Sequence, residues 1–307
     1  MNYQRDAFIS ELRVQATDNQ NIVFLSADFG APALDQFITD LPDQFCHLGI
    51  SEQNMVDVAI GMAMRGKRVF SYAMAPSVLM RCAEQHKLAA IMDLPITTIV
   101  AGVGFSYANA GPTHYATEDL SIAMNLIGSN VYTMSDASLA GACASYLSTT
   151  PEFCFVRLDR MPGDDLCSEN VIDITRGYRS FFSGKKLAII SHGYLLKKAH
   201  SIVTHNSHYQ SQIKVFDLFR CKPISEDFVS EIAEFETVLV LDEQITHSSL
   251  GIYLYPQILR GKDSSKIKSL SLADNYMFQN VGRDGLLSEA GLCDEVIEKE
   301  INSLISV

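Results

Sequence analysis

The sequence lacks long apolar runs and has few basic residues. No stretch reaches the roughly 18 uninterrupted apolar residues of a membrane-spanning helix, and the opening residues, MNYQRDAFIS, lack the apolar core of a signal peptide. With 24 Lys and Arg against 36 Asp and Glu, the net charge is −12. A nucleic-acid partner needs a basic face. We therefore expect a cytoplasmic protein without a membrane or nucleic-acid partner, although a local pocket can still bind a phosphorylated ligand.

Several familiar motifs are also missing. The seven cysteines are scattered and form no C-x-x-C pair, which predicts reduced, mostly buried thiols rather than a disulfide framework or a zinc site. The chain has no G-x-x-x-x-G-K-[ST], and its nearest approach to G-x-G-x-x-G, GVGFSYANAG, lacks the last glycine. No Ser-His-Asp or Cys-His arrangement is recognisable from spacing. The sequence therefore contains no motif that would indicate a zinc site or a nucleotide-binding site.

What the chain does have is a regular alternation of strand-like and helix-like segments, which predicts parallel sheets covered by helices. Expected strands lie at 21–28, 67–73, 95–102, 130–135 and 152–158, then at 186–193, 213–219, 237–243 and 266–272. Expected helices lie at 52–65, 77–92, 117–127 and 136–148, then at 194–204, 225–234, 249–260 and 288–304. We expect GRDG, at 282–285, to be a surface turn.

The fold class is therefore α/β, with two consecutive doubly wound domains. The first is expected at 1–162 and the second, smaller one at 186–307, because a polar, turn-rich linker at 163–185 interrupts the alternation. In such sheets ligands bind beyond the carboxyl ends of the strands.

Two segments stand where a site is expected. The loop VAGVGFSYANAGPTHYATEDL, 100–120, follows a strand and carries His114, which is either functional or a loop histidine satisfied by backbone bonds. In HLGISEQNMVDVAIGMA, 47–63, an acid, Glu52, begins an apolar helix. An acid there complements the helix dipole, or it lies in an apolar pocket and takes part in chemistry.

The segments FLSADFG, HLGISEQNMVDVAIGMAMRGKRVF, AGPTHYATEDLSIAMNLIGSNVYTMSDA, FVRLDR and VFDLFRCKPIS occur in the order and spacing of the transketolase family. GISEQNM and GPTH are the most specific of them. More closely, the chain resembles the C-terminal subunit of a split, two-gene transketolase, and it is more distantly similar to deoxyxylulose-phosphate synthase and to the β-subunit of 2-oxo-acid dehydrogenases. The resemblance implies a pyrimidine-binding domain followed by a transketolase C-terminal domain.

The resemblance also implies roles for individual residues. Glu52 would hydrogen-bond to N1′ of the aminopyrimidine of thiamine diphosphate, a role that needs an acid kept protonated near neutral pH. His114 would contact the donor ketose and its developing oxyanion. Asp28 matches an acid near the thiamine, and Arg160 matches a position that helps to bind substrate phosphate. Arg5 lies where many relatives have a basic residue, although each arginine alone is more often a solvated surface charge.

The segment SYAMAPSVLMRCAEQ, 71–85, departs from the family's pattern. The family supports the pyrimidine on aromatic rings here, whereas this chain offers Met74 and Val78, with Tyr72 close to the expected aromatic position. Arg81 matches an arginine of the synthase and of the split forms. Ala110, and a position near Gly102, replace an acid and a histidine that recognise the acceptor, so we expect a modified acceptor.

The chain lacks the G-D-G…N motif with which the family holds the diphosphate and Mg²⁺. The resemblance therefore implies a partner chain, the N-terminal transketolase subunit, which carries that motif and most of the Mg²⁺ site. We expect a heterotetramer built on a dimer of this chain, which transfers a two-carbon ketol unit from a ketose to an aldehyde. The alternatives are the β-subunit of a 2-oxo-acid dehydrogenase with a lipoyl partner, a deoxyxylulose-phosphate-synthase-like enzyme, or a non-catalytic homologue.

Overall fold

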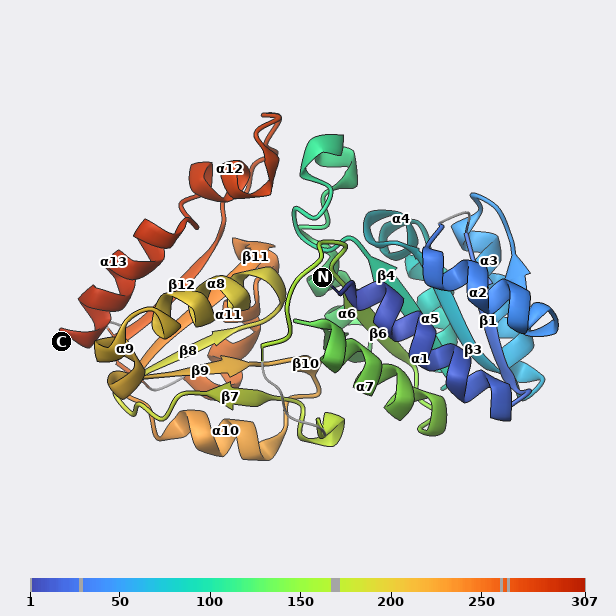
Figure 1. The fold of residues 1–307 in the computed structure, drawn as a ribbon, viewed down its shortest axis with the longest axis horizontal. Helices are drawn as coiled ribbons and strands as arrows, with labels where there is room; N and C mark the ends of the chain where they lie inside the picture. Colours follow the sequence, from blue (N-terminus) through green and yellow to red (C-terminus); the bar gives the residue numbers. More distant parts are fainter. Residues whose placement is uncertain (1, 28–29, 167–171, 260–261, 264–265, 307) are drawn as a thin grey trace. The chain divides into compact units, whose positions relative to one another are not determined.

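A computed structural model describes residues 2–27, 30–166, 172–259, 262–263 and 266–306 (Figure 1). The chain divides into two compact units. Unit 1 comprises Met1–Val103 and Ser121–Ile174, and unit 2 comprises Gly104–Leu120 and Thr175–Val307. The loop 104–120, which carries His114, therefore packs as part of unit 2 although the chain around it belongs to unit 1.

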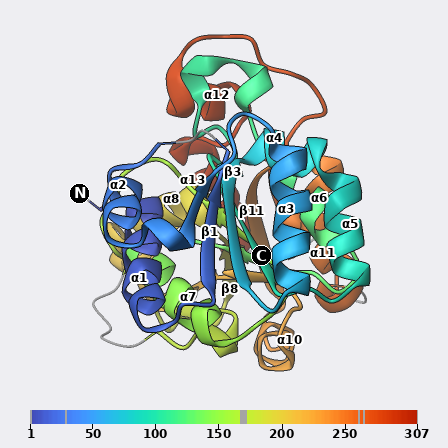
Figure 2. The ribbon, with the colours of Figure 1, turned by 90° about the vertical axis from the view of Figure 1, so that its right-hand side faces the viewer.

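Unit 1 is built on parallel strands in the order β5-β6-β4-β3-β1-β2. The strands are β1 (Ile22–Ser26), β2 (Phe45–His47), β3 (Arg68–Met74), β4 (Ile96–Ala101), β5 (Asn130–Thr133) and β6 (Cys154–Leu158). Figure 2 shows α1 and α7 on one side of β1 and β3, and α3 and α5 on the other. Because both faces are covered, every residue of β1, β4 and β6 is buried.

The helices of unit 1 alternate with its strands along the chain. They are α1 (Gln4–Asp18), α2 (Pro32–Asp40), α3 (Glu52–Met64), α4 (Ala75–Arg81), α5 (Ala83–Ile91) and α7 (Ala137–Thr149), with the 3₁₀ turn η1 (Pro42–Gln44). The helix α6 (Asp119–Asn125) begins in the loop that belongs to unit 2. The single helix expected at 77–92 is wrong in one respect, because it is divided at Cys82 into α4 and α5.

Unit 2 has a second sheet in the order β12-β11-β8-β9-β7, in which all neighbours are parallel except β7 and β9. Its strands are β7 (Arg179–Phe181), β8 (Leu187–Ser191), β9 (Ile213–Asp217), β11 (Thr237–Ile245) and β12 (Ile267–Leu272), and a short strand, β10 (Arg220–Lys222), follows β9. The two largely parallel sheets confirm the predicted α/β class. The edge strand β7 lies within the segment 163–185 that was expected to be a linker.

The helices of unit 2 are α8 (Gly193–Thr204), α9 (Ser207–Gln212), α10 (Glu226–Ala233), α11 (Leu250–Leu254), α12 (Gly282–Glu289) and α13 (Asp294–Ile305). A π-helical turn, Tyr255–Leu259, extends α11, and η2 (Ala108–Ala110), η3 (Pro112–His114), η4 (Ile174–Arg176) and η5 (Thr246–Ser248) are short turns of 3₁₀ type. The helix expected at 288–304 begins later, at Asp294.

GRDG is not a surface turn, because it forms the first turn of α12. Arg283, inside this segment, is buried and forms an ion pair with the buried carboxylate of Glu243. The polar composition of the segment indicated exposure, but a buried partner that is distant in the sequence compensates the charge.

Among the described residues, no helix is long and apolar enough to cross a membrane. The cysteines that the structure describes are free thiols. Cys82, Cys143, Cys154 and Cys221 are buried, as expected, whereas Cys46 and Cys293 are only partly buried. Cys167 lies outside the described residues.

Candidate active site

Glu52 is the first residue of α3 and belongs to its buried face. Ser51 precedes the helix, but its hydroxyl donates to the Leu48 carbonyl at 2.7 Å and does not cap the helix. Met55 and Val56, in the next turn, are completely buried. Only 8% of the Glu52 side chain is exposed. The acid therefore lies in an apolar setting and not on the solvated side of the first turn.

An arginine reaches this buried carboxylate from α4. Arg81 Nη1 donates to Glu52 Oε2 at 3.1 Å, and 59% of the Arg81 side chain is exposed. Cys82 follows Arg81, and the pKa of its thiol is raised to about 12, first by burial and then by the carboxylates of Glu52 and Asp57. The structure thus brings together two predicted cofactor-site residues, Glu52 and Arg81, which are distant in sequence.

The other predicted cofactor residues lie on β3 and α4. Val78 is completely buried in α4, and Met74, partly buried, ends β3 and precedes α4. Tyr72 is completely buried within β3, with its ring centroid 6.0 Å from that of Phe24. Tyr72 is thus part of the core of unit 1.

The predicted basic residues differ in their surroundings. Arg5, in the first turn of α1, donates from Nε to Asp6 Oδ1 at 2.9 Å. Burial lowers the pKa of Arg5, but the Asp6 carboxylate and the Tyr72 phenol raise it above the ordinary value. Arg160 is exposed and follows β6. Asp28 lies outside the described residues. The electrostatic influence of Tyr72 on Arg5 was not indicated by sequence spacing.

Hydrogen bonds within the loop 104–120 join the residues on either side of His114. Gly104 and Ala116 exchange both backbone hydrogen bonds at 3.0 Å. The Tyr115 hydroxyl donates to the Ala108 carbonyl at 3.0 Å, and the Tyr115 ring meets Phe105 edge-on at 5.0 Å. His114 is partly exposed at the end of η3. The loop is therefore a folded element and not a flexible connection.

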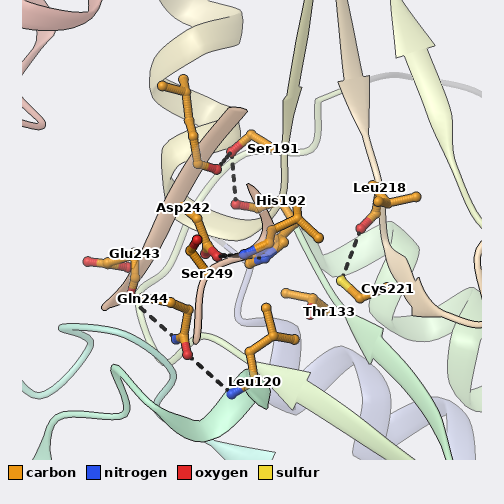
Figure 3. Close-up of polar contacts among 12 residues, drawn as sticks. Leu120, Thr133, Ser191, His192, Leu218, Cys221, Asp242, Glu243, Gln244 and Ser249 are labelled. Carbon is orange, nitrogen blue, oxygen red and sulfur yellow. Dashed lines mark hydrogen bonds and ion pairs between the residues drawn. The ribbon is translucent and has the colours of Figure 1, made fainter. Parts of the chain in front are cut away.

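Two polar residues at the end of β11 hold this loop, and sequence analysis missed both. Glu243 and Gln244 are buried, and Gln244 makes hydrogen bonds to the loop segment at 116–120 (Figure 3). The signal was present, since the polar run DEQ, 242–244, follows a buried strand at the carboxyl edge of the sheet. Among the described residues, no group of three or more His, Cys, Asp or Glu could hold a metal ion.

The chain is similar to known proteins along most of its length. A family model described as the transketolase pyrimidine-binding domain matches residues 3–162. The chain is 27% identical over 252 residues to one subunit of the apulose-4-phosphate transketolase of Phocaeicola vulgatus, covering 80% of each chain. It is 25% identical over 298 residues to the 6-deoxy-6-sulfo-D-fructose transketolase subunit SqwH of a Clostridium species, covering 96% of this chain and 89% of that protein.

One solved structure extends the comparison to the whole fold. It is described as a split gene transketolase in an inactive beta4 tetramer, with a TM-score of 0.85 at 21% identity, and the match covers 100% of this chain and 99% of that one. At 21% identity, this match shows that the two proteins share a fold. It extends the agreement from residues 3–162 to the second unit.

Proposed function

The chain belongs to the transketolase pyrimidine-binding domain family, and on that premise we propose that it is the C-terminal subunit of a two-chain, thiamine-diphosphate-dependent transketolase. The enzyme would transfer a two-carbon ketol unit from a ketose to an aldehyde. Two relatives named as subunits of transketolases support this proposal, because the chain spans 80% and 89% of their lengths.

The observation that carries the proposal is the position of Glu52. An aminopyrimidine needs an acid for its ring nitrogen and an apolar surface for its face, and unit 1 offers both. The carboxyl group of Glu52 is nearly buried, and α4, which packs against α3, contributes Val78, with Met74 just before it. These residues fit the pyrimidine half of the cofactor, although a methionine and a valine replace the aromatic support that the family uses.

Thiamine diphosphate, when bound, would supply the nucleophilic carbon that attacks the ketose carbonyl. Glu52 would hold a proton on its carboxyl group and share it with the ring nitrogen N1′, which requires its contact with Arg81 to change. The large exposed fraction of Arg81 allows this movement. Arg81, Tyr72 and Asp28 would complete the cofactor site, with Tyr72 acting as support from the core.

His114 would meet the donor ketose and stabilise negative charge on its carbonyl oxygen. The hydroxyl of Thr113 lies 2.9 Å from His114 Nδ1, which favours an orientation in which Nε2 faces the substrate. Arg5 and Arg160 would bind the phosphate or another anionic group of the sugar. These assignments rest on the family's motifs and on the partial exposure of His114 and the exposure of Arg160.

The diphosphate and Mg²⁺ would be bound mainly by an N-terminal subunit. We propose a heterotetramer built on a dimer of this chain, in the cytoplasm. The related split transketolase, described as an inactive tetramer of β chains, supports self-association of this type of subunit and the need for a second chain. The relatives are named for apulose 4-phosphate and 6-deoxy-6-sulfo-D-fructose, which supports a specialised sugar as substrate.

Reconstitution tests the proposal. A neighbouring gene should encode a chain of about 270 residues with the G-D-G…N motif, on the scale of one or two ordinary domains. Calorimetry should find weak or no binding of thiamine diphosphate and Mg²⁺ to this chain alone and clear binding to the pair, which should also transfer a ketol unit. Tight Mg²⁺-dependent binding by the isolated chain would overturn the split-site proposal. Acyl transfer to a lipoyl domain instead of ketol transfer would favour the dehydrogenase alternative.

A further inference from the structure

We propose that Gln244 is a positioning residue that fixes the loop 104–120 and thereby the imidazole of His114. The inference rests on the proposed function only in assigning a substrate contact to His114. The contacts that support it lie entirely within unit 2, because the loop and β11 both belong to that unit.

The side-chain amide of Gln244 makes three contacts with the loop's final segment. Nε2 donates to the Ala116 carbonyl at 2.9 Å and to Asp119 Oδ1 at 2.8 Å, and Oε1 accepts from the Leu120 N–H at 3.2 Å. Gln244 and Asp119 are each only 1% exposed. Figure 3 shows the contact between Gln244 and Leu120. Ala116, the nearest of these loop residues in sequence, lies two residues after His114.

Glutamine suits this position because its side chain both donates and accepts hydrogen bonds. A carboxamide donates two hydrogens and also accepts, so it can satisfy a carbonyl, a carboxylate and an N–H together. A glutamate would accept from Leu120 but would oppose the Asp119 carboxylate and the Ala116 carbonyl. A leucine of similar size would leave these polar groups without this partner in a buried place.

The neighbouring residues of β11 hold the same loop at two further places. The Ile245 N–H donates to the Thr117 carbonyl at 2.9 Å. The Glu243 carboxylate occupies the space where a Cβ on Gly104 would lie, and Gly104 has a φ of +57°, which favours glycine. Loop and strand are thus in contact at 104 and at 116–120, the two ends of the segment that presents His114.

Glu243 itself is held rigidly. Arg283 donates to its two oxygens, from Nε at 2.9 Å and from Nη2 at 2.5 Å. The Arg283 guanidinium lies over the Tyr194 ring, 4.0 Å from its centroid. The helix α12 therefore supports one end of the loop through Glu243, while Gln244 fixes the other end directly.

Hydrogen exchange on the full chain tests the structural part of the inference. We compare the wild type with Gln244→Ala and with the control Ser191→Ala, which removes a buried hydroxyl that donates to the Leu241 carbonyl at 2.9 Å, away from the loop. The amides of Gly104, Ala116 and Leu120 should exchange at least about tenfold faster in Gln244→Ala and at unchanged rates in Ser191→Ala. Unchanged protection in Gln244→Ala would overturn the inference.

A double-mutant cycle tests the functional part in the complex of this chain with its partner subunit. Gln244→Ala should lower kcat/KM for the ketose donor by about tenfold to a hundredfold. If Gln244 acts through His114, adding Gln244→Ala to His114→Ala should cause less than about a twofold further loss. Independent, multiplicative losses would contradict a positioning role. A wild-type rate in His114→Ala alone would instead contradict the assigned role of His114 and leave the exchange result as the test of Gln244.

If Gln244→Ala does not fold, a pair of substitutions that swaps the amide and the acid between positions 244 and 119 provides a second test. Gln244→Glu alone places two carboxylates together and should release the loop. Combining it with Asp119→Asn restores a donor and an acceptor across the same contact. The double variant should recover at least about half of the protection at Gly104 and Ala116 that Gln244→Glu loses. No recovery would show that the contact between 244 and 119 does not fix the loop.

Discussion

Arg81 Nη1 lies 3.1 Å from Oε2 of Glu52 and joins the end of α4 to the first residue of α3. The two side chains are unequal partners, since the acid is nearly buried and the arginine is mostly in solvent. An exposed guanidinium exchanges partners with water or a ligand at small cost, whereas the buried acid cannot leave its position. In the proposed cofactor site, Arg81 is therefore the side chain that we expect to move.

Replacing Arg81 should therefore affect ligand binding more than folding. Arg81→Ala should change the free energy of unfolding by less than about 1 kcal/mol, because ion pairs with an exposed partner contribute little. In the reconstituted pair the apparent affinity for thiamine diphosphate should fall severalfold. Arg65→Ala, an exposed arginine at the other end of α3, is the matched control. Equal cofactor affinity in both variants would contradict a cofactor role for Arg81.

His86 should make unit 1 sensitive to acid. It is completely buried, its Nε2 lies 3.2 Å from the Val78 carbonyl, and burial lowers its pKa to about 4, with the Val78 carbonyl opposing the shift. Against an unfolded pKa of about 6.5, the unfolded chain binds more protons between pH 6.5 and 4. The free energy of unfolding should therefore be fully maintained above pH 6.5 and fall by about 3 kcal/mol as the pH drops to 4.

Urea unfolding at a series of pH values measures this dependence. His86→Leu should flatten the curve between pH 6.5 and 4, whereas His208→Leu, at an exposed position, should leave it unchanged. Since His86 contacts the α4 residue Val78, the acid-induced loss should also loosen the helix that carries Arg81. A slope in this pH window that survives His86→Leu would show that other groups cause it.

The residues at 102 and 110 also predict which aldehyde acceptors the enzyme uses poorly. Ala110 lies exposed in η2, and Gly102 has a φ of +84°, a conformation in which a histidine would be strained. Two polar groups that would recognise a hydroxyl and a phosphate of an acceptor are therefore absent at these positions. Each such contact is worth about 1–3 kcal/mol, so the reconstituted pair should use ribose 5-phosphate poorly.

A panel of aldehydes with one ketose donor provides the measurement. Ala110→Asp should improve the use of ribose 5-phosphate relative to the wild type, while the rate of donor cleavage stays the same. If ribose 5-phosphate proves to be the best acceptor for the wild type, the prediction about the acceptor is wrong, whereas the role of Glu52 is unaffected.

The sequence predicted the architecture well because local patterns determine it. Short β-branched runs separated by helix-like segments indicate a parallel sheet. The pattern around Glu52 predicted the start of a helix but left open whether the acid is buried there. The segment at 282–285 was predicted wrongly, because whether Arg283 is exposed depends on Glu243, a partner far away in the chain. Composition alone cannot show such a pairing.

The site was predictable only in part, for the same reason. Glu52 and Arg81 were both proposed from motifs, but the contact between them appears only when α3 and α4 pack. Gln244 makes hydrogen bonds to the loop 104–120, which packs in unit 2. The polar run at 242–244 indicated a position at the sheet edge but not this partner. Tyr72 lies close to the expected aromatic position, yet both faces of its strand are buried, so it lies in the core. Asp28 and the roles of Arg5 and Arg160 stay predictions.

The most direct test of the account is the activity of Glu52→Gln in the reconstituted pair of chains. An amide cannot share a carboxylic proton with the ring nitrogen, so ketol transfer should fall far below a tenth of the wild-type rate while thermal melting is unchanged. Asp57→Asn, an exposed acid on the same helix, should keep the wild-type rate. If Glu52→Gln retains more than about a tenth of the rate, a loss of only about 1.4 kcal/mol in the barrier, Glu52 does not have the assigned role and the central claim fails.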